Sequence, residues 1–254
     1  METADLAWRA EEACMNAWPS PREVILDGWR LRAAGGAIRR TNSANPLRGE
    51  RGDPRAIIPL AEAVYTSLGQ TPLFRVPSLA EGLDEVLEAA GYAAEGHTLT
   101  LFAALEPRRA AAESAEIAAV PSREWLAARR RLNGVDAREQ DIYEAMLESI
   151  LLPKVFAATR IDGGIAALAY AVICDGLAVI ESVITDPAWR RRGLGRRSVG
   201  ALLDWARDAG ATGACLQVVG NNAAAVALYR SLGFEQELYR YHYRRKSLER
   251  QRQA

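Results

Sequence analysis

The chain has 254 residues, of which 49% are hydrophobic and 25% are charged, and this balance excludes collagen-like, low-complexity and wholly disordered classes. Its 32 basic and 32 acidic residues cancel, so no global field would attract nucleic acid or an acidic membrane. The three cysteines are widely spaced without a CxxC pair, which argues against a disulfide framework or a zinc site. With no signal-peptide pattern and no run of about 18 uncharged apolar residues, we expect a soluble, cytoplasmic protein. Abundant alanine and scarce lysine hint at a GC-rich bacterial genome.

The first half of the chain shows an α/β order. A helix is predicted at the start, where Leu6, Ala10, Cys14 and Ala17 repeat at helical spacing before two prolines stop the pattern. Glycines and prolines then separate short apolar strands from two further amphipathic helices. The predicted strands are 24–26, 29–33, 37–41, 73–76 and 98–104, and the predicted helices are 54–67 and 81–90.

The second half begins with two predicted helices, 122–132 and 136–151, each opened by a residue that can cap free amides. Strands and helices alternate after them, and the dipeptide Asp175-Gly176 is a strong hairpin signal. The predicted strands are 155–159, 165–174, 177–185, 214–219 and 238–244, and the predicted helices are 195–208 and 223–232.

The two halves align with each other at a constant offset of 142 residues. In this register Leu60 falls on Leu202, Val76 on Val218, and Gly91 on Gly233; Ile38 also falls on Ile180 and Val86 on Leu228. Chance similarity between alanine-rich segments is the alternative. Duplication of one α/β unit is favoured, because strand, helix, strand, helix and glycine cap coincide in one register.

A basic, glycine-containing segment from Thr185 to Gly195 ends a predicted strand and opens a helix. Gly193 and Gly195 would let backbone amides approach a bound group closely, and a helix N-terminus favours anions. This pattern predicts a phosphate cradle. Five arginines either add charge-assisted contacts or form a solvated surface, and the residues alone leave both readings open: Arg190, Arg191, Arg192, Arg196 and Arg197.

Two better-known phosphate loops are excluded. Gly195 is followed by two arginines, whereas a Walker loop has Lys and then Ser or Thr. Ser198 stands where a dinucleotide fingerprint has its third glycine. What remains is Arg-x-x-Gly-x-Gly, at Arg190, Gly193 and Gly195.

This pattern resembles that of the GNAT superfamily of acyl-coenzyme-A-dependent N-acyltransferases. A second motif, NAAAVALYRSLGF from Asn222 to Phe234, is similar to the family's Asn-x-x-Ala-x-x-Leu-Tyr-x-x-x-Gly-Phe helix. The similarity covers roughly 116–244, and the first half resembles the degenerate repeat of tandem family members. The resemblance implies an α/β fold with two tandem GNAT-like domains, each a mixed, mostly antiparallel sheet flanked by helices. The expected boundaries are a degenerate domain at 1–108 without an acyl-CoA site, a connector at 109–115, and a catalytic domain at 116–254.

The resemblance also implies a binding site for acetyl-CoA, used as a co-substrate without a metal. Arg190 and the main chain of the cradle would hold the pyrophosphate. The main chain of Val183 and Thr185, in the preceding strand, would pair with the pantetheine arm as an added strand. Asn222 matches a coenzyme contact, although it is also well suited to cap a helix. The implied cofactor-binding residues are Val183, Ile184, Thr185, Arg190, Arg191, Arg192, Gly193, Leu194, Gly195, Arg196 and Asn222.

Two side chains are implied in catalysis. Tyr229 matches the family's general acid, which would protonate the departing thiolate; with a phenol pKa near 10 that transfer would be nearly balanced. From periodicity alone Tyr229 would be a core aromatic. Glu181 matches a position where many members carry a glutamate and would act as general base, although a water relay could replace it. The alternatives for Glu181 are an edge or solvent-facing side chain, or one paired with an arginine.

The first copy has lost this machinery. In the same register Gly193 falls on Arg51, Gly195 on Asp53, Asn222 on Ala80, Tyr229 on Leu87 and Glu181 on Arg39. A carboxylate at Asp53 would repel a pyrophosphate. We therefore expect one acyl-CoA site per chain.

The expected activity is transfer of an acetyl group from acetyl-CoA to a primary amine by direct attack in a ternary complex. Main-chain N–H groups of 183–185 would meet the negative charge that develops on the thioester oxygen. The alternative is a non-catalytic acyl-CoA sensor. We expect a small-molecule or peptide amine acceptor, held by helices 122–132 and 136–151, no nucleic-acid or membrane partner, and a monomer or homodimer.

Overall fold

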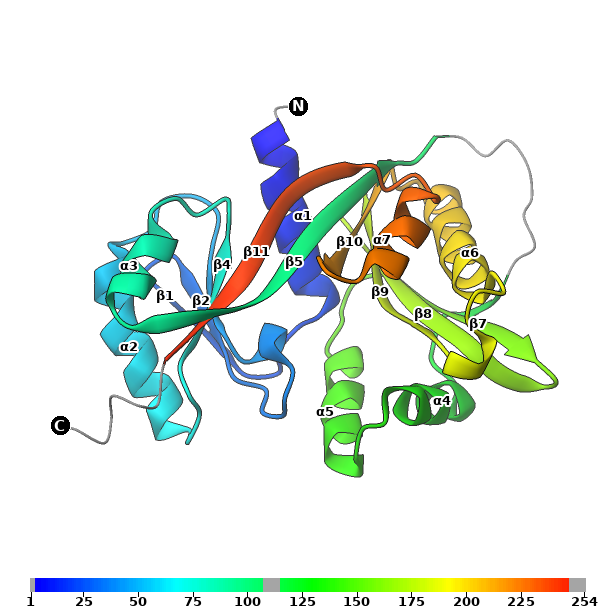
Figure 1. Cartoon of the computed structure of the whole chain (residues 1–254), viewed down its shortest axis with the longest axis horizontal. Helices are drawn as coiled ribbons and strands as arrows, with labels where there is room; N and C mark the ends of the chain where they lie inside the picture. Colours follow the sequence, from blue (N-terminus) through cyan, green and yellow to red (C-terminus); the bar gives the residue numbers. More distant parts are fainter. Residues whose placement is uncertain (1–2, 107–114, 247–254) are drawn as a thin grey trace. The chain divides into compact units, whose positions relative to one another are not determined.

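The computed structural model describes residues 3–106 and 115–246, and the contacts within the chain divide it into two compact units (Figure 1). Unit 1 comprises Met1–Pro19, Thr100–Val218 and Asn222–Leu238, and unit 2 comprises Ser20–Leu99, Val219–Asn221 and Tyr239–Ala254. This division differs from the expected boundary between 108 and 116. The expected connector lies, except for Ala115, outside the described residues.

The division is not sequential because the chain passes between the units more than once. Helix α1 (Thr3–Ala17) packs on strands of unit 1. Strands β5 (Tyr92–Ala104) and β11 (Gln236–Lys246) each contribute residues to both units. The two ends of the chain are therefore exchanged relative to a simple tandem arrangement.

Unit 2 is a sheet with strand order β1-β2-β3-β4-β11-β5 and two helices. Its aromatic core includes Trp29, Phe74 and Tyr92, whose rings meet edge to face at centroid distances of 6.1 and 5.3 Å. Its remaining elements are β1 (Glu23–Leu26), β2 (Trp29–Arg32), β3 (Ala44–Pro46), α2 (Pro54–Ser67), β4 (Leu73–Pro77) and α3 (Leu83–Ala89).

The predicted strand 37–41 is wrong. Arg39–Thr41 forms a 3₁₀ turn, η1, and strand β3 follows it. The reason is the side chain of Asn42, which donates to the carbonyls of Gly35 and Ile38 at 2.8 and 2.9 Å and so closes the segment into a loop. Such local side-chain to backbone bonds compete with strand pairing.

Unit 1 has strand order β5-β10-β9-β8-β7-β6, with β9 and β10 parallel and the pairs from β9 to β6 antiparallel (Figure 1). Strand β6 was not predicted. Its elements besides α1 are β6 (Glu116–Ala118), α4 (Arg123–Asn133), α5 (Ala137–Glu148), β7 (Lys154–Ile161), β8 (Gly164–Cys174), β9 (Leu177–Thr185), α6 (Leu194–Asp208), β10 (Gly213–Val219) and α7 (Ala223–Arg230).

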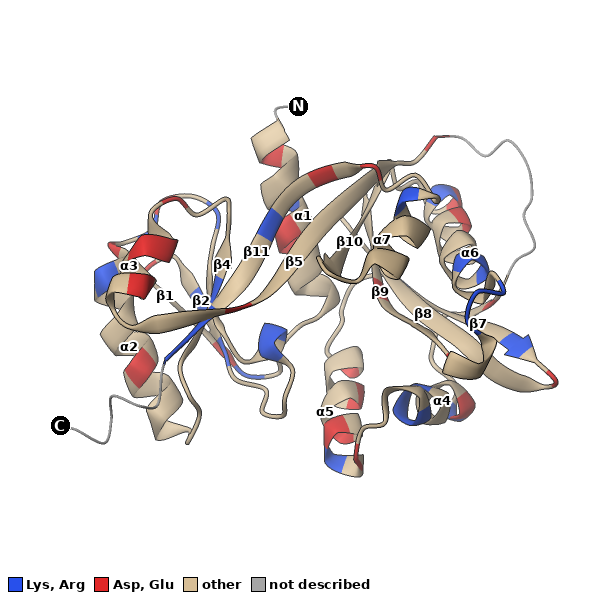
Figure 2. Cartoon of the chain, viewed as in Figure 1, with Lys and Arg blue, Asp and Glu red and all other residues tan. Residues whose placement is uncertain are grey.

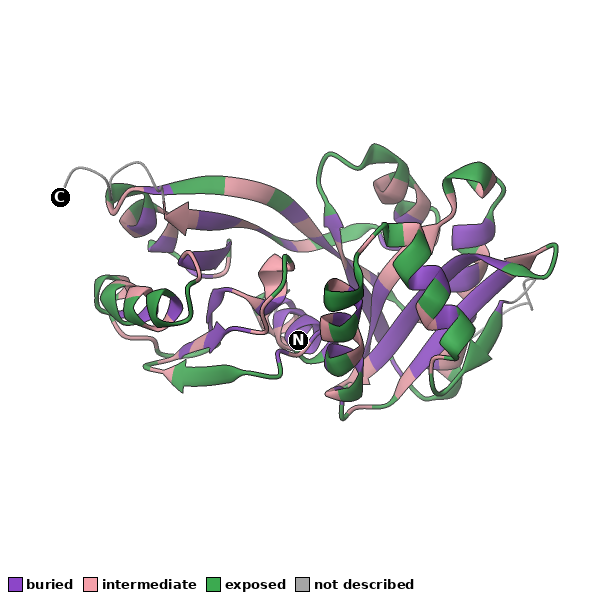
Figure 3. Ribbon diagram, turned by 90° about the horizontal axis from the view of Figure 1, so that it is seen from below, coloured by how far each residue is buried: buried purple, intermediate pink, exposed green. Residues whose placement is uncertain are grey.

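Helices cover both faces of the unit 1 sheet. Tyr170 of β8 donates its hydroxyl hydrogen to Ala17 O at the end of α1 at 2.9 Å, so its side of the sheet faces α1. Thr159 of β7, whose pairing partner is Ala167, meets Ser198 of α6 at 2.9 Å on the other side. Because side chains alternate along a strand, β8 is buried on both faces and reads as a continuous apolar run. Figure 3 shows these strands buried between helices whose outer faces are exposed.

Four elements of unit 2 recur at the 142-residue offset. Helices α2 and α3 fall on α6 and α7, strand β4 falls on β10, and β5 falls on β11. The alignment fails at Ile38 and Ile180, because the first lies in a loop and the second in β9. None of the helices within the described residues is long and apolar enough to cross a bilayer.

Candidate functional site

The loop between β9 and α6 is anchored at Asp186. Its carboxylate accepts a hydrogen bond from Ala188 N at 3.0 Å and forms an ion pair with Arg131 of α4, with an N–O distance of 2.9 Å. Arg131 also donates to Ile165 O at 3.0 Å, so α4, β8 and the loop are tied together. The hydrogen bond from the Arg131 guanidinium, followed by that from Ala188, lowers the pKa of Asp186.

After this anchor the backbone forms a cradle of free amides. The first helical bond of α6 is donated by Arg197 N to Gly193 O at 3.0 Å. Within the described residues, the six N–H groups from Arg191 to Arg196 therefore have no acceptor in the chain. Arg191 and Gly193 both have left-handed backbones, with φ of 62° and 78°, and alternation of this kind turns successive N–H groups toward one concavity. The predicted anion cradle thus has the geometry to bind a phosphate group.

Gly195 is needed for close packing around this cradle. A Cβ atom there would lie 3.2 Å from Thr185 Oγ1 and 3.4 Å from Leu228 Cδ2. Gly195 therefore lets α6 approach both β9 and α7, whereas Gly193 supplies the left-handed cap and has open space beside it.

The arginines of the segment have different surroundings. The Arg192 guanidinium lies 4.6 Å from the centroid of the Trp189 ring. The side chain of Arg196 points away from the cradle, because its guanidinium donates hydrogen bonds to the carbonyl and the hydroxyl of Ser231 at the end of α7. Arg190, Arg191 and Arg192 are exposed, and Figure 2 shows basic residues along the loop that leads into α6.

Strand β9 is open on one edge near its end. Its parallel pairing with β10 ends at Ile180, opposite Leu216, although β9 continues to Thr185. On the other edge the register with β8 slips, so that both Ser182 and Val183 lie opposite Ala169. This is a β-bulge, with Ser182 in the left-handed region at φ 51°.

The alternation of the main chain decides which peptide groups face the open edge. Asp186 N donates to Ala166 O of β8 at 2.8 Å, and Ile184 pairs with Leu168 two residues earlier. The peptide groups of Val183 and Thr185 therefore face away from β8, toward the edge that β10 has left. Val183 and Thr185 are the two residues whose main chain was predicted to pair with the pantetheine arm, whereas the main chain of Ile184, also predicted to bind the coenzyme, faces β8.

Tyr229 lies in α7, with 8% of its surface exposed and its ring edge-on to Phe234 at 6.1 Å. Within the described residues its hydroxyl has no hydrogen-bond partner in the protein. Burial, and then the charge of Glu181, raise the pKa of the phenol. The prediction of a nearly balanced transfer from a phenol of ordinary pKa is therefore wrong for the free protein, in which Tyr229 is a weaker acid.

Glu181 is 5% exposed on β9, immediately before the bulge. The solvent-facing alternative for this residue is therefore wrong. Its charge acts on the phenol of Tyr229 and on the thiol of Cys14, so these three groups share one region between α1, β9 and α7. Cys14 and Cys215 are buried there with their sulfurs 4.0 Å apart, and they act as packing groups.

Asn222 caps helix α7. Its Oδ1 accepts a hydrogen bond from Ala225 N at 3.2 Å, which confirms the structural reading of this residue. The side-chain amide Nδ2 has no acceptor among the described residues, so it is available to a ligand. Both roles considered for Asn222 are compatible with this geometry.

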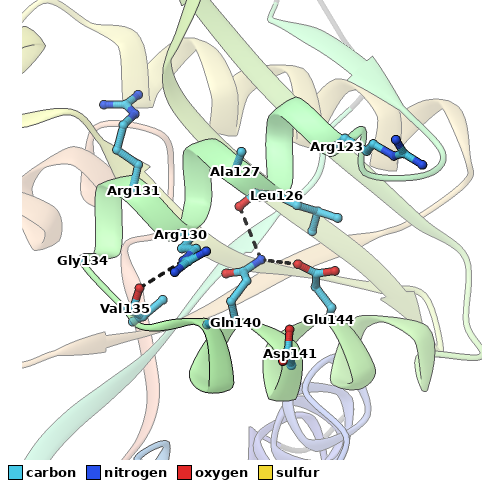
Figure 4. Close-up of a pocket in the computed structure, with 11 residues that line it drawn as sticks. Arg123, Leu126, Ala127, Arg130, Arg131, Gly134, Val135, Gln140, Asp141 and Glu144 are labelled. Carbon is cyan, nitrogen blue, oxygen red and sulfur yellow. Dashed lines mark hydrogen bonds between the residues drawn. The ribbon is translucent and has the colours of Figure 1, made fainter.

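A groove of about 620 Å³ lies between α4 and α5, the two helices predicted to hold the acceptor (Figure 4). Arginines such as Arg123 and Arg130 line the α4 wall, and Asp141 and Glu144 line the α5 wall. None of the predicted catalytic or cofactor-binding residues lines it. On α4 the lining residues lie opposite Trp125, which packs on the sheet, so the groove lies on the side of α4 that faces away from the sheet.

Four residues around the site were missed by sequence reasoning: Arg131, Ser182, Ser231, and Tyr143 of α5, whose Oη lies 2.9 Å from Ser182 Oγ. Each acts through a contact with a distant part of the chain, and an exposed arginine or a serine within a strand carries no local signal of such a contact. Only the break in apolar character after Ile180 hinted that β9 changes there.

The comparisons with known proteins agree with one another. The model of the family described as "Probable histone acetyltransferase Rv0428c C-terminal" matches residues 3–244. A relative named as the uncharacterized N-acetyltransferase YobR of Bacillus subtilis (strain 168) is 25% identical over 243 residues, which cover 93% of this chain and 97% of that protein.

Two solved structures share the fold over nearly the whole chain. A GCN5-related N-acetyltransferase from Kribbella flavida has a TM-score of 0.69 at 20% identity and covers 96% of both chains. A tandem GNAT protein from the clavulanic acid biosynthesis pathway has a TM-score of 0.66 at 14% identity, covering 95% of this chain and 92% of that one. The chain therefore belongs to the Rv0428c C-terminal family of acetyltransferases, within the GNAT superfamily, and is an acyltransferase.

Proposed function

We propose that this protein transfers an acetyl group from acetyl-CoA to a primary amine by direct attack in a ternary complex. The observation that carries the proposal is the continuity of β9 with the cradle: one segment of unit 1 offers unpaired peptide groups at its open edge and then six free amides. When bound, acetyl-CoA would supply the acetyl group as a thioester and leave as a thiol.

The binding part of the proposal uses the main chain more than side chains. The amides from Arg191 to Arg196 would bind the pyrophosphate, with Arg190 adding charge. The peptide groups of Val183 and Thr185 would pair with the pantetheine arm in the place that β10 leaves open. The N–H of Val183 would also lie where negative charge develops on the thioester oxygen.

The catalytic part uses Glu181 and Tyr229 as a coupled pair. The charge of Glu181 contributes to the raised pKa of Tyr229. When Glu181 accepts the proton of the attacking amine, directly or through a water, that contribution is removed and the phenol becomes a stronger acid. Tyr229 would then release its proton to the thiolate when it is needed.

The first copy in unit 2 is proposed to bind no acyl-CoA. At the start of α2 the carboxylate of Asp53 accepts a hydrogen bond from Arg55 N at 2.8 Å. The N-terminus of α2 would otherwise favour an anion, but the negative charge of Asp53 occupies it. This charge opposes the binding of a second pyrophosphate.

The test combines binding with turnover. Calorimetry with acetyl-CoA should show one binding site per chain. Arg190→Ala should weaken the binding of acetyl-CoA, whereas Arg123→Ala, which lies outside the site, should leave the binding unchanged. A panel of peptide, amino-acid, polyamine and aminoglycoside amines, with acetyl, propionyl and succinyl donors, is then screened for release of coenzyme A. Tyr229→Phe should retain binding and lose turnover.

Two results would contradict the proposal. If the protein does not bind acetyl-CoA, the proposed function is excluded. Binding without turnover of any amine would favour the alternative of a non-catalytic acyl-CoA sensor.

A further inference from the structure

Ser182 has an unusual backbone for its place in the fold. It has φ of 51°, and it lies inside β9 at the bulge, where two residues face one residue of β8. A left-handed backbone is costly for a residue other than glycine, and it persists only where surrounding contacts hold it. The structure therefore requires a contact that stabilises Ser182.

Tyr143 of α5 supplies that contact. Its Oη lies 2.9 Å from Ser182 Oγ, at hydrogen-bond distance. This bond joins two hydroxyl groups that are 39 residues apart in the sequence, and it fixes the side chain of the bulge residue from outside the sheet. The bulge is thus held by a helix and not only by strand pairing.

The position of Tyr143 is itself held from two sides. The Arg129 guanidinium lies 3.7 Å from the centroid of its ring, and the ring of Trp18 lies 5.5 Å away. Arg129 is buried and donates to Gln140 Oε1 at 3.0 Å, which links α4 to α5. Figure 4 shows the carboxamide of Gln140 held further by Leu126 O and Glu144. The phenol is therefore rigidly placed.

The bulge determines the direction of the next peptide groups. If β9 continued after Glu181 in regular alternation, without a bulge, the N–H of Val183 would face β8 instead of the open edge. The residue that sets this direction is the one that Tyr143 contacts.

We propose that Tyr143 and Ser182 form a hydroxyl clamp that positions the Val183 N–H toward the thioester carbonyl oxygen. Tyr143 is a positioning residue in this proposal, since it touches no reacting atom. The proposal rests on the proposed acetyl transfer, in which Val183 N–H meets the developing negative charge.

The experiment compares Tyr143→Phe, Ser182→Gly, Ser182→Ala and the double variant Tyr143→Phe with Ser182→Gly in the full chain. Tyr143→Phe should lower kcat roughly tenfold, as expected for one lost hydrogen bond, and change the Kd of acetyl-CoA less than about twofold. Ser182→Gly should retain most of kcat, because glycine adopts positive φ without strain, whereas Ser182→Ala should lose at least as much as Tyr143→Phe. In the Ser182→Gly background, Tyr143→Phe should have little further effect.

The control is Ser198→Ala, which removes a buried hydroxyl pair of the same length, 2.9 Å to Thr159, away from the bulge. It should lower the unfolding temperature and leave kcat unchanged. A structural role of Tyr143 alone would instead make the effects of Tyr143 and Ser182 variants additive and make Ser182→Gly as poor as Ser182→Ala. Either result overturns the clamp.

A measurement without turnover separates the clamp from the proposed function. In the free protein, Tyr143→Phe should shift the ¹⁵N–¹H resonances of residues 181–185, and unchanged resonances would exclude the clamp. In the native protein, acetyl-CoA should shift the Val183 amide. If Tyr143→Phe shifts these resonances in the free protein but acetyl-CoA leaves the Val183 amide resonance unchanged, the clamp exists. Its role in positioning and the proposed function are then both contradicted.

Discussion

The two terminal guanidinium nitrogens of Arg196, near the start of α6, donate hydrogen bonds to the carbonyl and the hydroxyl of Ser231, just past the end of α7, so the helix that follows the cradle holds the helix that carries Tyr229. The Ser231 hydroxyl in turn donates to Leu228 O at 2.6 Å. A cation at the end of a helix also interacts favourably with its free carbonyl groups. The placement of the proposed acid is thereby linked to the placement of the proposed phosphate site.

Arg196→Gln should loosen α7 without removing the backbone amides of the cradle. We expect kcat to fall roughly threefold to tenfold, equivalent to one charge-assisted hydrogen bond at an exposed site, with the Kd of acetyl-CoA changed much less. Steady-state kinetics with calorimetry measure both. An equal loss of affinity at unchanged kcat would instead mean that the Arg196 side chain contacts the coenzyme.

Gly195→Ala should weaken both packing and binding, because its Cβ would lie 3.2 Å from Thr185 Oγ1 and 3.4 Å from Leu228 Cδ2. We expect a loss of about 1–3 kcal/mol in the free energy of unfolding, typical of overpacking, and weaker acetyl-CoA binding. Gly200→Ala is the matched control in the same helix, since nothing lies within 4 Å of its added Cβ. That variant should be more stable than the native chain by roughly 0.5–1 kcal/mol. Equal effects of the two substitutions in denaturant titrations would contradict this packing argument.

Tyr229 should contribute to loss of stability in alkali. Burial and the nearby Glu181 raise the pKa of its phenol in the folded state above the value of about 10 for an unfolded chain. The contribution of the phenol to the free energy of unfolding is therefore complete below about pH 10 and is lost as pH rises through the folded pKa. Between the unfolded and the folded pKa only the unfolded state releases the proton, and this favours unfolding. Tyr229→Phe should unfold less steeply than the native protein between about pH 10 and 11.5. Identical pH profiles of the two proteins in denaturant titrations would refute the assignment.

Asp84 should contribute stability that acid removes. Its carboxylate accepts from Arg244 Nε at 2.7 Å and lies 2.8 Å from His242 Nε2. Arg244 first, and His242 after it, lower its pKa, so the contribution is present above the unfolded value near 3.9 and is lost as pH falls through the folded pKa. Because the side chain is 42% exposed, Asp84→Asn should cost only about 1 kcal/mol at pH 7. The difference between native and variant proteins should shrink as the pH falls below the unfolded value and vanish below the folded pKa of Asp84, and a pH-independent difference would exclude the ionic cause.

Residues close together in the sequence were sufficient for the cradle and for helix α7. Gly193 and Gly195 follow a strand and precede a helix, and the free amides of such a junction exist whatever surrounds it. Asn222 and the apolar stripe through Tyr229 predict a capped helix in the same local way. These two motifs carried the family resemblance, and the match of residues 3–244 to the family confirms it.

Contacts between distant segments decided the remaining features of the site. The end of pairing between β9 and β10, and the left-handed Ser182 beside Tyr143, depend on partners far along the chain. The raised pKa of Tyr229 likewise depends on burial and on Glu181.

The sequence by itself determined that this chain has a glycine-containing turn of free amides followed by a helix, and a later capped helix that carries a tyrosine, because hydrogen-bonding and steric preferences of neighbouring residues specify both. Only the tertiary structure decided which peptide groups of β9 face the open edge and how acidic Tyr229 is. Strand register, burial and the field of a neighbouring carboxylate are properties of packed segments, and no local pattern encodes them.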